Sequence, residues 1–352
     1  MEVVLEIKDM RYGIRRSRSI EIARFAGTLT PISYLITHIS TNHHLPKESI
    51  PLNTPKRVIA LGFFDGVHKG HGALLRRVTE RAAALNAVPA AFTFDVHPES
   101  LILGRATPLL STIEDRTDLM RRLYGIEDVV VAHYDREMMK TPWEDFITHT
   151  LIRDCSAVHV VAGHDFRFGY RGEGNPQRLR EKCEQLGIGC DIIHPVIQEG
   201  ITVSSTYIRT LIAQGEMARA QTFLGHPHTL TGVVHHGKKL GRALGFPTIN
   251  LTLPEGLIVP ALGVYATRVW VDGHDYMAVT NIGRRPTVDD GDALSVEAFL
   301  LDFDGDLYDR SVRLEFFKFL RPERKFSDLD ALRAAVMQNA QQTRTFFQFA
   351  QL

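Results

Sequence analysis

Two histidines separated by two residues are the first groups in this sequence that could do chemistry. His68 and His71 lie in the stretch Gly-Phe-Phe-Asp-Gly-Val-His-Lys-Gly-His, where an apolar run meets a predicted helix. In the first turn of that helix both side chains would face one side and donate hydrogen bonds to phosphate oxygens. Close approach of a ligand to the backbone would be permitted by three glycines, Gly62, Gly66 and Gly70. The alternatives are a metal site, which lacks a third ligand and an HExxH pattern, and a solvated helix start.

Two further segments place polar or aromatic side chains at the ends of predicted elements. Ser204–Thr206 opens a helix that also carries Arg209, and helix capping alone could explain these hydroxyls. Gly163–Gly169 follows a predicted strand, and its Phe166 and Phe168 could stack on a flat ring or anchor the loop in a core. Taken alone, each segment fits a functional and a structural interpretation.

A glycine-rich stretch later in the chain could enclose a polyphosphate. Gly237, Gly241 and Gly245 recur at every fourth position. Thr248 and Asn250 follow at i and i+2, so their oxygens would share one face of a strand and could hold a Mg²⁺ ion that bridges phosphates. A glycine-rich hairpin start without a ligand is the alternative. The sequence has no GxxxxGK[ST] motif, which argues against a P-loop kinase.

The elements that must position these residues follow two hydrophobic patterns. Between residue 57 and about residue 225, apolar β-branched runs alternate with amphipathic stretches, which predicts a parallel sheet covered on both faces. After His226, Asp272-Gly273 and Asp304-Gly305 each separate two apolar runs, which predicts two β-hairpins in a mostly antiparallel barrel. The predicted helices span 70–86, 113–124, 142–154, 176–186, 205–213, 217–223 and, at the end of the chain, 328–347. We therefore expect an α/β domain over 56–225 and a β-barrel domain with a C-terminal helix over 226–352.

Residues 1–55 lack this regularity. Their apolar stretch 25–39 is too polar to span a bilayer, and interspersed acidic residues argue against a secretory signal or a transit peptide. We interpret the segment as an irregular extension. The 352-residue chain has 41 basic and 41 acidic residues, so it lacks the positive surplus of a bulk polyanion binder. Three cysteines without a CxxC pattern suit a reducing compartment, so we expect a cytoplasmic protein.

Taken together, the motifs resemble a known family. GxFDGxHxGH at 62–71, GHDFRFG at 163–169 and SSTYIR at 204–209 are similar to the HxGH nucleotidyltransferases, and specifically to the FMN adenylyltransferase module of the bacterial bifunctional riboflavin kinase/FAD synthetase family. Residues 232–250 resemble the GxVxxGxxxGRxLGFPTxN signature of that family's riboflavin kinase module, and further matches follow at 281–287, 296–297, 305–308 and 320–326. The resemblance covers residues from about 57 to about 347 and implies a Rossmann-like HxGH domain followed by a riboflavin kinase barrel.

For the N-terminal domain, the resemblance implies attack of FMN phosphate on the α-phosphorus of ATP with release of pyrophosphate. No protein nucleophile is needed because this phosphate is already anionic, so His68, His71 and Arg209 would screen like charges. The other residues implied to bind ATP or its phosphates are Gly62, Phe64, Asp65, Gly66, Gly70, Ser205 and Thr206. Those implied to lie near the flavin or its phosphate are Asp165, Phe166 and Phe168.

For the C-terminal domain, the resemblance implies transfer of the ATP γ-phosphoryl group to riboflavin. Glu297 matches the family's catalytic glutamate, which accepts the proton of the ribityl 5′-hydroxyl. Thr248 and Asn250 match the Mg²⁺ and phosphate contacts, and Arg321 and Glu323 match flavin-binding positions. The loop implied to cover the nucleotide contains Gly237, Gly241, Arg242 and Gly245.

Three positions depart from the family pattern. Phe299 stands where many relatives carry His, Asp309 where the family usually has Gly, and Ile249 where Ala is commoner. Every residue assigned to either activity is present, so we expect both activities, with ATP and Mg²⁺ as cofactors. The partners we expect are small-molecule substrates, without nucleic acid or membrane, in a monomer or weak homo-oligomer. An enzyme with one vestigial module and a flavin-binding regulator without turnover are the alternatives.

Overall fold

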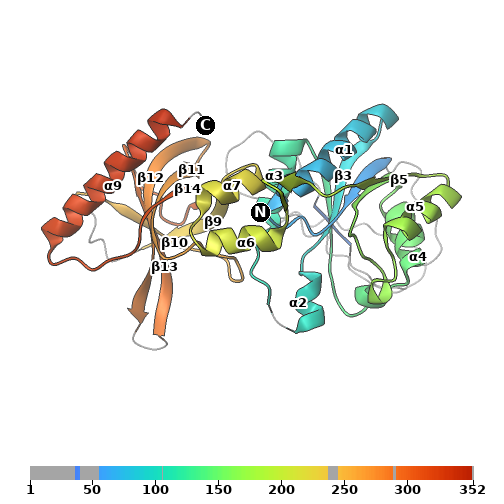
Figure 1. The fold of residues 1–352 in the computed structure, drawn as a ribbon, viewed down its shortest axis with the longest axis horizontal. Helices are drawn as coiled ribbons and strands as arrows, with labels where there is room; N and C mark the ends of the chain where they lie inside the picture. Colours follow the sequence, from blue (N-terminus) through green and yellow to red (C-terminus); the bar gives the residue numbers. More distant parts are fainter. Residues whose placement is uncertain (1–35, 40–54, 105, 237–244, 288–290, 351–352) are drawn as a thin grey trace, which may run out of the picture. The chain divides into compact units, whose positions relative to one another are not determined.

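The computed structural model describes residues 36–39, 55–104, 106–236, 245–287 and 291–350. These residues form a parallel sheet with helices, followed in the chain by an antiparallel barrel and a final helix (Figure 1). The fold class predicted from the sequence is thereby confirmed. Within the described ranges, no helix has the length and apolar character needed to cross a lipid bilayer.

The parallel sheet has six strands in the order β1-β4-β3-β2-β5-β6. Its strands are β1 (Ile36–Ile39), β2 (Arg57–Leu61), β3 (Val88–Phe94), β4 (Asp128–Ala132), β5 (Ala157–Gly163) and β6 (Gly189–Ile193). From β2 the chain adds β3 and β4 on one side and β5 and β6 on the other, so the strand order reverses between β2 and β5. A reversal of this kind opens a crevice at the carboxyl ends of the two strands. The loops after β2 and β5, which carry two of the predicted motifs, therefore leave the sheet at this crevice.

The edge strand β1 was not anticipated from the sequence. Residues 36–39 fall in the segment interpreted as irregular, yet they pair in parallel with β4, from Ile36 opposite Val129 to Ile39 opposite Ala132. Four residues are too few to show a hydrophobic period, so the strand is recognised only by its pairing with the edge of β4.

Helices cover both faces of the sheet, as the continuous apolar runs predict. Along β2, Val58 and Ala60 join one buried cluster and Ile59 and Leu61 join another, because successive side chains point to opposite faces. The helical elements of this domain are α1 (Lys69–Leu85), α2 (Pro98–Leu103), α3 (Ile113–Tyr124), α4 (Trp143–Asp145), the π-helical η3 (Phe146–Asp154) and α5 (Pro176–Gln185). The helix predicted over 142–154 is thus short α4 continued by a π-helix.

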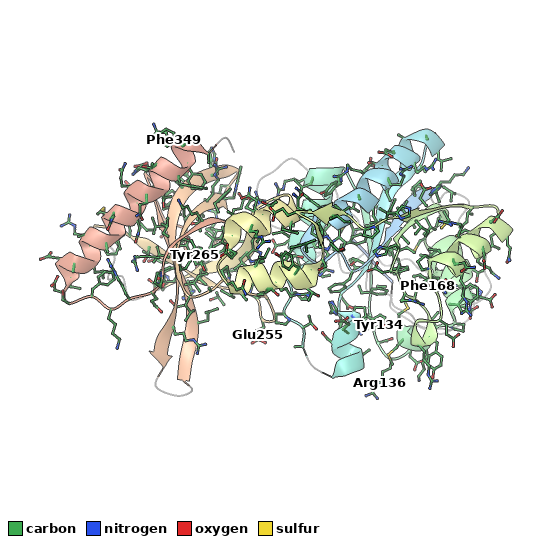
Figure 2. The ribbon with its side chains drawn as sticks, in the orientation of Figure 1. Tyr134, Arg136, Phe168, Glu255, Tyr265 and Phe349 are labelled. Carbon is green, nitrogen blue, oxygen red and sulfur yellow. The ribbon has the colours of Figure 1, made fainter. Side chains whose placement is uncertain are left out.

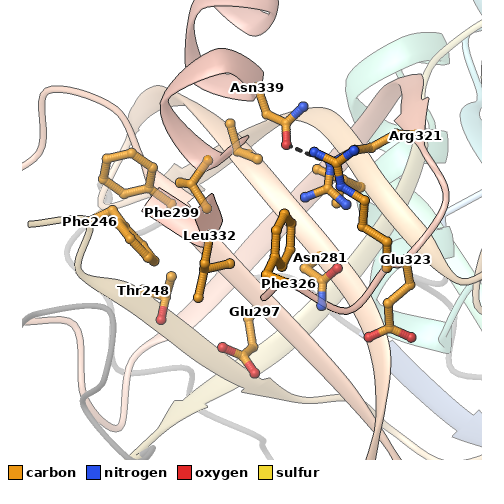
Figure 3. Close-up of a pocket in the computed structure, with 14 residues that line it drawn as sticks. Phe246, Thr248, Asn281, Glu297, Phe299, Arg321, Glu323, Phe326, Leu332 and Asn339 are labelled. Carbon is orange, nitrogen blue, oxygen red and sulfur yellow. Dashed lines mark hydrogen bonds between the residues drawn. The ribbon is translucent and has the colours of Figure 1, made fainter. Parts of the chain in front are cut away.

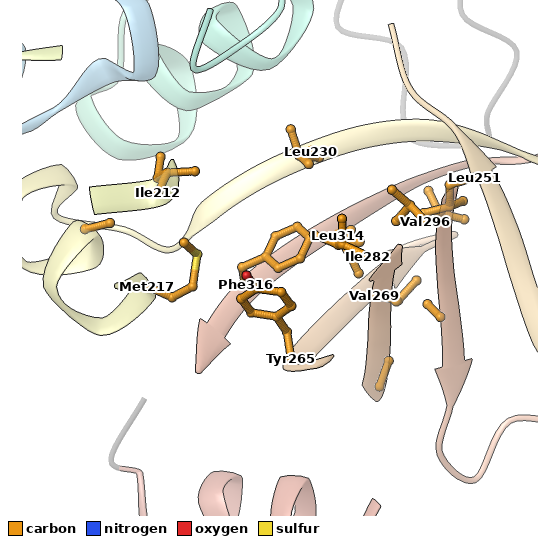
Figure 4. Close-up of a cluster of buried hydrophobic side chains, with 14 of the residues drawn as sticks. Ile212, Met217, Leu230, Leu251, Tyr265, Val269, Ile282, Val296, Leu314 and Phe316 are labelled. Atoms are coloured by element: carbon orange, nitrogen blue, oxygen red, sulfur yellow. The ribbon is translucent and has the colours of Figure 1, made fainter. Parts of the chain in front are cut away.

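Two further helices, α6 (Ser205–Ala213) and α7 (Met217–Leu224), share a hydrophobic core with the barrel. Ile212 and Met217 lie in one buried cluster with Leu230, Tyr265 and Phe316 of the barrel strands (Figure 4). Tyr265, labelled in Figure 2, is fully buried, and its hydroxyl donates a hydrogen bond to the Ala261 carbonyl. Both helices are expected from the sequence to belong to the N-terminal domain, but their apolar side chains pack with the C-terminal one.

The barrel closes with six antiparallel strands in the order β10-β13-β12-β11-β14-β9. Its strands are β9 (His228–His235), β10 (Thr248–Thr252), β11 (Gly263–Val271), β12 (His274–Thr287), β13 (Gly291–Leu300) and β14 (Ser311–Arg321), and α9 (Leu329–Phe349) follows them. The first predicted hairpin is confirmed, since β11 and β12 pair across Asp272 and Gly273, which both have positive φ.

The second predicted hairpin is wrong. The strands β13 and β14, which flank Asp304-Gly305, do not pair with each other: β13 pairs with β10 and β12, and β14 with β9 and β11. An Asp-Gly pair reports a local tendency to turn, whereas closure of the barrel decides which strands become neighbours. The residues between β13 and β14 instead form a loop that borders a cavity.

Candidate active sites

The loop that leaves β2 contains several residues with a positive φ, among them Phe64 and Gly66. Phe64 has a φ of 56° and is fully buried, so its ring anchors the loop. Gly66 has a φ of 72°, and a Cβ at this position would lie 2.7 Å from Leu110 Cδ1. A larger residue at position 66 would therefore meet both backbone strain and a clash. This tight turn lets α1 begin directly after the loop.

His68 and His71 lie together at the N-terminus of α1, on one side as predicted. His68 is the N-cap residue, its Nδ1 accepts a hydrogen bond from the His71 backbone N–H at 3.2 Å, and the ring centroids stack 3.6 Å apart. Burial lowers the pKa of His68 to about 3 and also lowers the pKa of His71, so both imidazoles are neutral at pH 7. Because Nδ1 of His68 is an acceptor, its proton resides on Nε2, which makes Nε2 a donor suited to an anion.

Asp65 and Arg209, far apart in the sequence, form an ion pair beside these histidines. Arg209 Nη2 donates to Asp65 Oδ2 at 2.7 Å, and the side chains are 15% and 2% exposed. Asp65 Oδ1 accepts hydrogen bonds from the backbone N–H groups of Leu110 at 2.8 Å and Ser111 at 3.2 Å. Both carboxylate oxygens are thus engaged within the protein, and Asp65 holds Arg209 at the loop after β2.

The start of α6 is tied to the same loop. Ser204 caps the helix by accepting the Tyr207 N–H at 3.3 Å, so the capping interpretation is confirmed for this residue. Ser205 instead donates its hydroxyl to the Asp65 carbonyl oxygen at 3.1 Å. Thr206 is exposed. The structure therefore brings four of the predicted phosphate-site side chains, His68, His71, Ser205 and Arg209, to one loop.

The loop after β5 separates its predicted flavin residues. The Asp165 side chain is 81% exposed. Phe168 is a core side chain: it is 7% exposed, and its ring centroid lies 5.4 Å from that of Phe146 (Figure 2). Phe166 stacks on Phe168 at 5.5 Å and is partly buried. The core interpretation therefore fits Phe168, whereas Asp165 and Phe166 lie nearer the surface.

In the barrel, strand register places Glu297 between two asparagines. Glu297 on β13 lies opposite Asn250 on β10 and opposite Asn281 on β12. Directly opposite residues of neighbouring strands share a face of the sheet, so these three side chains form a polar row across three strands. Ser295, two residues earlier on the same face, donates its hydroxyl to Glu297 Oε1 at 3.2 Å. The carboxylate is therefore oriented by its neighbours.

A cavity of ≈ 290 Å³ lies beside this row (Figure 3). Its polar lining includes Glu297, Thr248, Arg321 and Asn339, and Arg321 Nε donates to Asn339 Oδ1 at 3.0 Å. Large apolar side chains complete the wall, among them Phe246, Phe299, Phe326, Leu332 and Val336. A mostly apolar cavity with a few polar groups suits a flat amphipathic molecule.

A second cavity of ≈ 380 Å³ shares a lining residue of β10 with the first. It is lined by Thr248, Asn250 and the loop residues Asp304–Tyr308, and Thr248 lines both cavities. The hydroxyl and amide oxygens of Thr248 and Asn250 are neutral donors of the kind that Mg²⁺ uses together with substrate phosphates. Gly245 has a φ of 81°, whereas the predicted loop residues Gly237, Gly241 and Arg242 lie outside the described residues.

The three departures from the family pattern are accommodated locally. Phe299 lines the first cavity, where its ring packs 6.1 Å from that of Phe246. Asp309 adopts a φ of 60°, the left-handed conformation that glycine would favour and that Asp tolerates. Ile249 packs against the barrel core, as its opposite direction from Thr248 and Asn250 predicts.

Several cavity residues were not identified as site residues from the sequence. In the sequence, Asn281 and Phe326 are only parts of the matching motifs, and Asn339 is one of several polar residues on a terminal helix. Asn281 becomes visible as a neighbour of Glu297 only through the register of β12 and β13. No local pattern carries that information.

Comparisons with known proteins agree with both halves of the chain. A family model described as FAD synthetase matches residues 50–207, and one described as riboflavin kinase matches residues 224–347. The bifunctional riboflavin kinase/FMN adenylyltransferase of Listeria monocytogenes is 34% identical over 293 residues, which is 83% of this chain and 92% of that protein. Its Escherichia coli counterpart is 33% identical over 292 residues, 82% of this chain and 92% of that protein.

A solved structure shares the fold. The crystal structure described as a macrolide-efflux protein from Streptococcus pneumoniae superposes with a TM-score of 0.74 at 28% identity, covering 83% of this chain and 95% of that chain. With two family models and relatives matched along nearly their whole length, the chain belongs to the bifunctional riboflavin kinase/FMN adenylyltransferase family, whose members phosphorylate riboflavin to FMN and adenylate FMN to FAD.

Proposed function

We propose that the two reactions take place at two separate sites, one in each domain. The domain of residues 226–352 would phosphorylate riboflavin at the row of Asn250, Glu297 and Asn281, and the domain of residues 56–225 would adenylate FMN at the loop after β2. The observation that carries the first assignment is the position of Glu297, which lines one cavity while its strand neighbour Asn250 lines the other.

At the barrel site, riboflavin would occupy the first cavity and ATP the second. The ribityl 5′-oxygen attacks the γ-phosphorus, Glu297 accepts the hydroxyl proton, and the bond from the γ-phosphorus to the bridging oxygen breaks to release ADP. Thr248 and Asn250 would hold the Mg²⁺ ion, which when bound neutralises negative charge on the ATP phosphates. Arg321 and Glu323, both in the lining of the first cavity, would contact the flavin.

At the N-terminal site, an oxygen of the FMN phosphate attacks the α-phosphorus of ATP, and the bond to the bridging oxygen breaks to release pyrophosphate. His68 and His71 would donate N–H groups to the phosphates as neutral imidazoles, and Arg209, oriented by Asp65, would add positive charge. Ser205 and Thr206 would bind phosphate at the α6 N-terminus, and Asp165 and Phe166 would approach the flavin.

A time course distinguishes these assignments from the alternatives. Purified full-length protein is incubated with riboflavin, ATP and Mg²⁺, and flavins are separated by chromatography. FMN that appears first and FAD that follows support two working sites. FMN without FAD would indicate a vestigial N-terminal module, and flavin binding without conversion would indicate a regulator. We further propose that the protein works in the cytoplasm on small molecules alone, as a monomer or weak homo-oligomer.

A further inference from the structure

Arg116, on α3, is an arginine to which neither of the two proposed reactions assigns a role. It is fully buried, with 0% of its surface exposed. Its Nη1 donates to the Phe63 carbonyl at 2.7 Å, to the Thr93 hydroxyl at 3.2 Å and to the Phe94 carbonyl at 3.3 Å. These three acceptors lie at or just beyond the carboxyl ends of β2 and β3. The guanidinium therefore contacts the edge of the sheet from which the loop carrying His68 and His71 emerges.

The charge of Arg116 is not cancelled by a contacting acid. No described carboxylate forms an ion pair with it, and its Nε and Nη2 are buried without a hydrogen-bond partner among the described residues. Its other close neighbour is the Phe63 ring, whose centroid lies 4.1 Å from the guanidinium carbon. Burying a cation in this way is costly unless an anion compensates it. Burial lowers the pKa of Arg116 to about 10, so that it is still charged at pH 7.

The phosphate-site side chains assigned above supply little positive charge that is not offset by an acid. Arg209 is paired with Asp65, and the two histidines are neutral at pH 7. A site for ATP and FMN phosphate must nevertheless hold several negative charges side by side. Arg116 interacts electrostatically with Asp65, Glu114, His71 and His97. Its charge contributes to lowering the pKa of His71, which keeps that imidazole neutral.

We propose that Arg116 is a positioning residue for adenylyl transfer: it fixes the Phe63 carbonyl at the start of the loop and supplies a buried positive charge that favours polyphosphate there. It acts through the loop and through its field, since its buried side chain has no exposed surface with which to touch substrate. This inference rests on the assignment of FMN adenylylation to the loop after β2.

Three variants of the full-length protein test the proposal: Arg116→Met, Arg116→Lys and, as a matched control on the same helix, Arg122→Met. Arg122 is a half-exposed arginine paired with Asp118. FMN adenylylation is measured with inorganic pyrophosphate as an inhibitor, and the midpoint of thermal unfolding of each variant reports folding of the whole chain. We expect Arg116→Met to lower kcat/KM for adenylylation and to weaken pyrophosphate inhibition, each by about tenfold or more. Arg122→Met is expected to change neither by more than about twofold.

Arg116→Lys separates the charge from the geometry. At low pH the ammonium retains the charge, so pyrophosphate inhibition is preserved, while kcat falls because the planar fork is lost. A buried lysine releases its proton more easily, so between about pH 6 and pH 9 the variant should lose pyrophosphate affinity relative to the parent protein. A residue with a purely structural role would not produce this pH dependence.

The outcomes are distinguishable even where one variant does not fold. Unchanged pyrophosphate inhibition in folded Arg116→Met, or a pH-independent ratio between Arg116→Lys and the parent protein, overturns the proposal. Adenylylation that survives loss of both His68 and His71 would instead overturn the location of the site. Loss of adenylylation in that double histidine variant but not in Arg116→Met would disprove only the role of Arg116.

Discussion

Single side chains in this protein acquire their chemistry from neighbours that are distant in the sequence. Glu297 lies between Asn250 and Asn281 because three strands align in register, and Ser295 orients its carboxylate. Arg209 lies at the histidine loop because Asp65 holds it there. Both arrangements place hydrogen-bond partners around a charged group, which fixes the group before substrate binds.

The first prediction concerns Glu297. Glu297→Gln keeps the size of the side chain but removes the proton acceptor, so we expect riboflavin phosphorylation to fall by about 10²–10⁴-fold. FMN adenylylation should stay unchanged because it uses the other domain. Chromatography of flavins, with riboflavin or FMN supplied separately, measures both rates. Asp330→Asn, an exposed change in the same domain, serves as the control. Equal loss of both activities in a folded variant would contradict separate sites.

The second prediction concerns the stacked histidines. The double variant His68→Ala, His71→Ala removes the neutral N–H donors at the α1 N-terminus, so we expect FMN adenylylation to fall by at least about 100-fold. Riboflavin phosphorylation by the same preparation should be retained, which shows that the C-terminal domain is folded. A variant that still converts FMN to FAD at the parental rate would refute a role for this pair.

At the scale of elements, helix termini position the N-terminal site. The first turn of α1 carries the histidines, and the first turn of α6 carries Ser205 and leads to Arg209. Ser204 caps α6, and Ser205 ties it to the Asp65 carbonyl. A small shift of α6 would therefore move Arg209 relative to the histidines.

The third prediction follows from that geometry. Ser204→Ala removes the cap and should destabilise the protein by about 1 kcal/mol, with a lower midpoint of thermal unfolding and slower FMN adenylylation. Asp328→Ala is the matched control, because Asp328 caps α9 in the other domain through the Ala331 N–H at 2.8 Å. Both variants should lose similar stability, but only Ser204→Ala should slow adenylylation. The same adenylylation rate in the two variants would show that the α6 cap has no influence on the site.

At the scale of the whole molecule, the described residues form one compact unit in which α6 contacts both domains. Its first turn contacts the loop after β2, while Ile208, Leu211 and Ile212 lie in the core shared with the barrel. Burial in this unit also holds several histidines neutral. His68 at the N-cap of α1 and His228 on β9 are 6% and 2% exposed, and burial lowers the pKa of each to about 3.

The fourth prediction is the resulting acid sensitivity. The pKa of each buried histidine is lower in the folded than in the unfolded protein, so the unfolded state binds more protons in acid. The stability contributed by these neutral histidines is complete above about pH 6.5 and is lost as the pH falls toward about 3. Each histidine should lower the free energy of unfolding by up to about 1.4 kcal/mol per pH unit in that window.

Thermal unfolding at a series of pH values tests this effect. His228→Gln should flatten the dependence of the unfolding midpoint on pH, whereas the exposed His274→Gln should leave its slope unchanged. Parallel curves for the parent protein and His228→Gln would contradict the contribution of His228.

From the sequence alone we predict the alternation of buried strands and helices, the change to an antiparallel half and the motifs of both reactions. These features are local, because the hydrophobic period and the turn residues depend only on residues that are close together in the sequence. The folded chain was needed to show that β13 pairs with β12 rather than β14 and that α6 shares the barrel core. It was also needed to show that residues 36–39 add an edge strand and that Arg116 contacts the start of the histidine loop. The hydrophobic period of a sequence shows which face of a helix or strand is buried. Closure of the barrel and packing of the whole chain decide which other elements pack against that face.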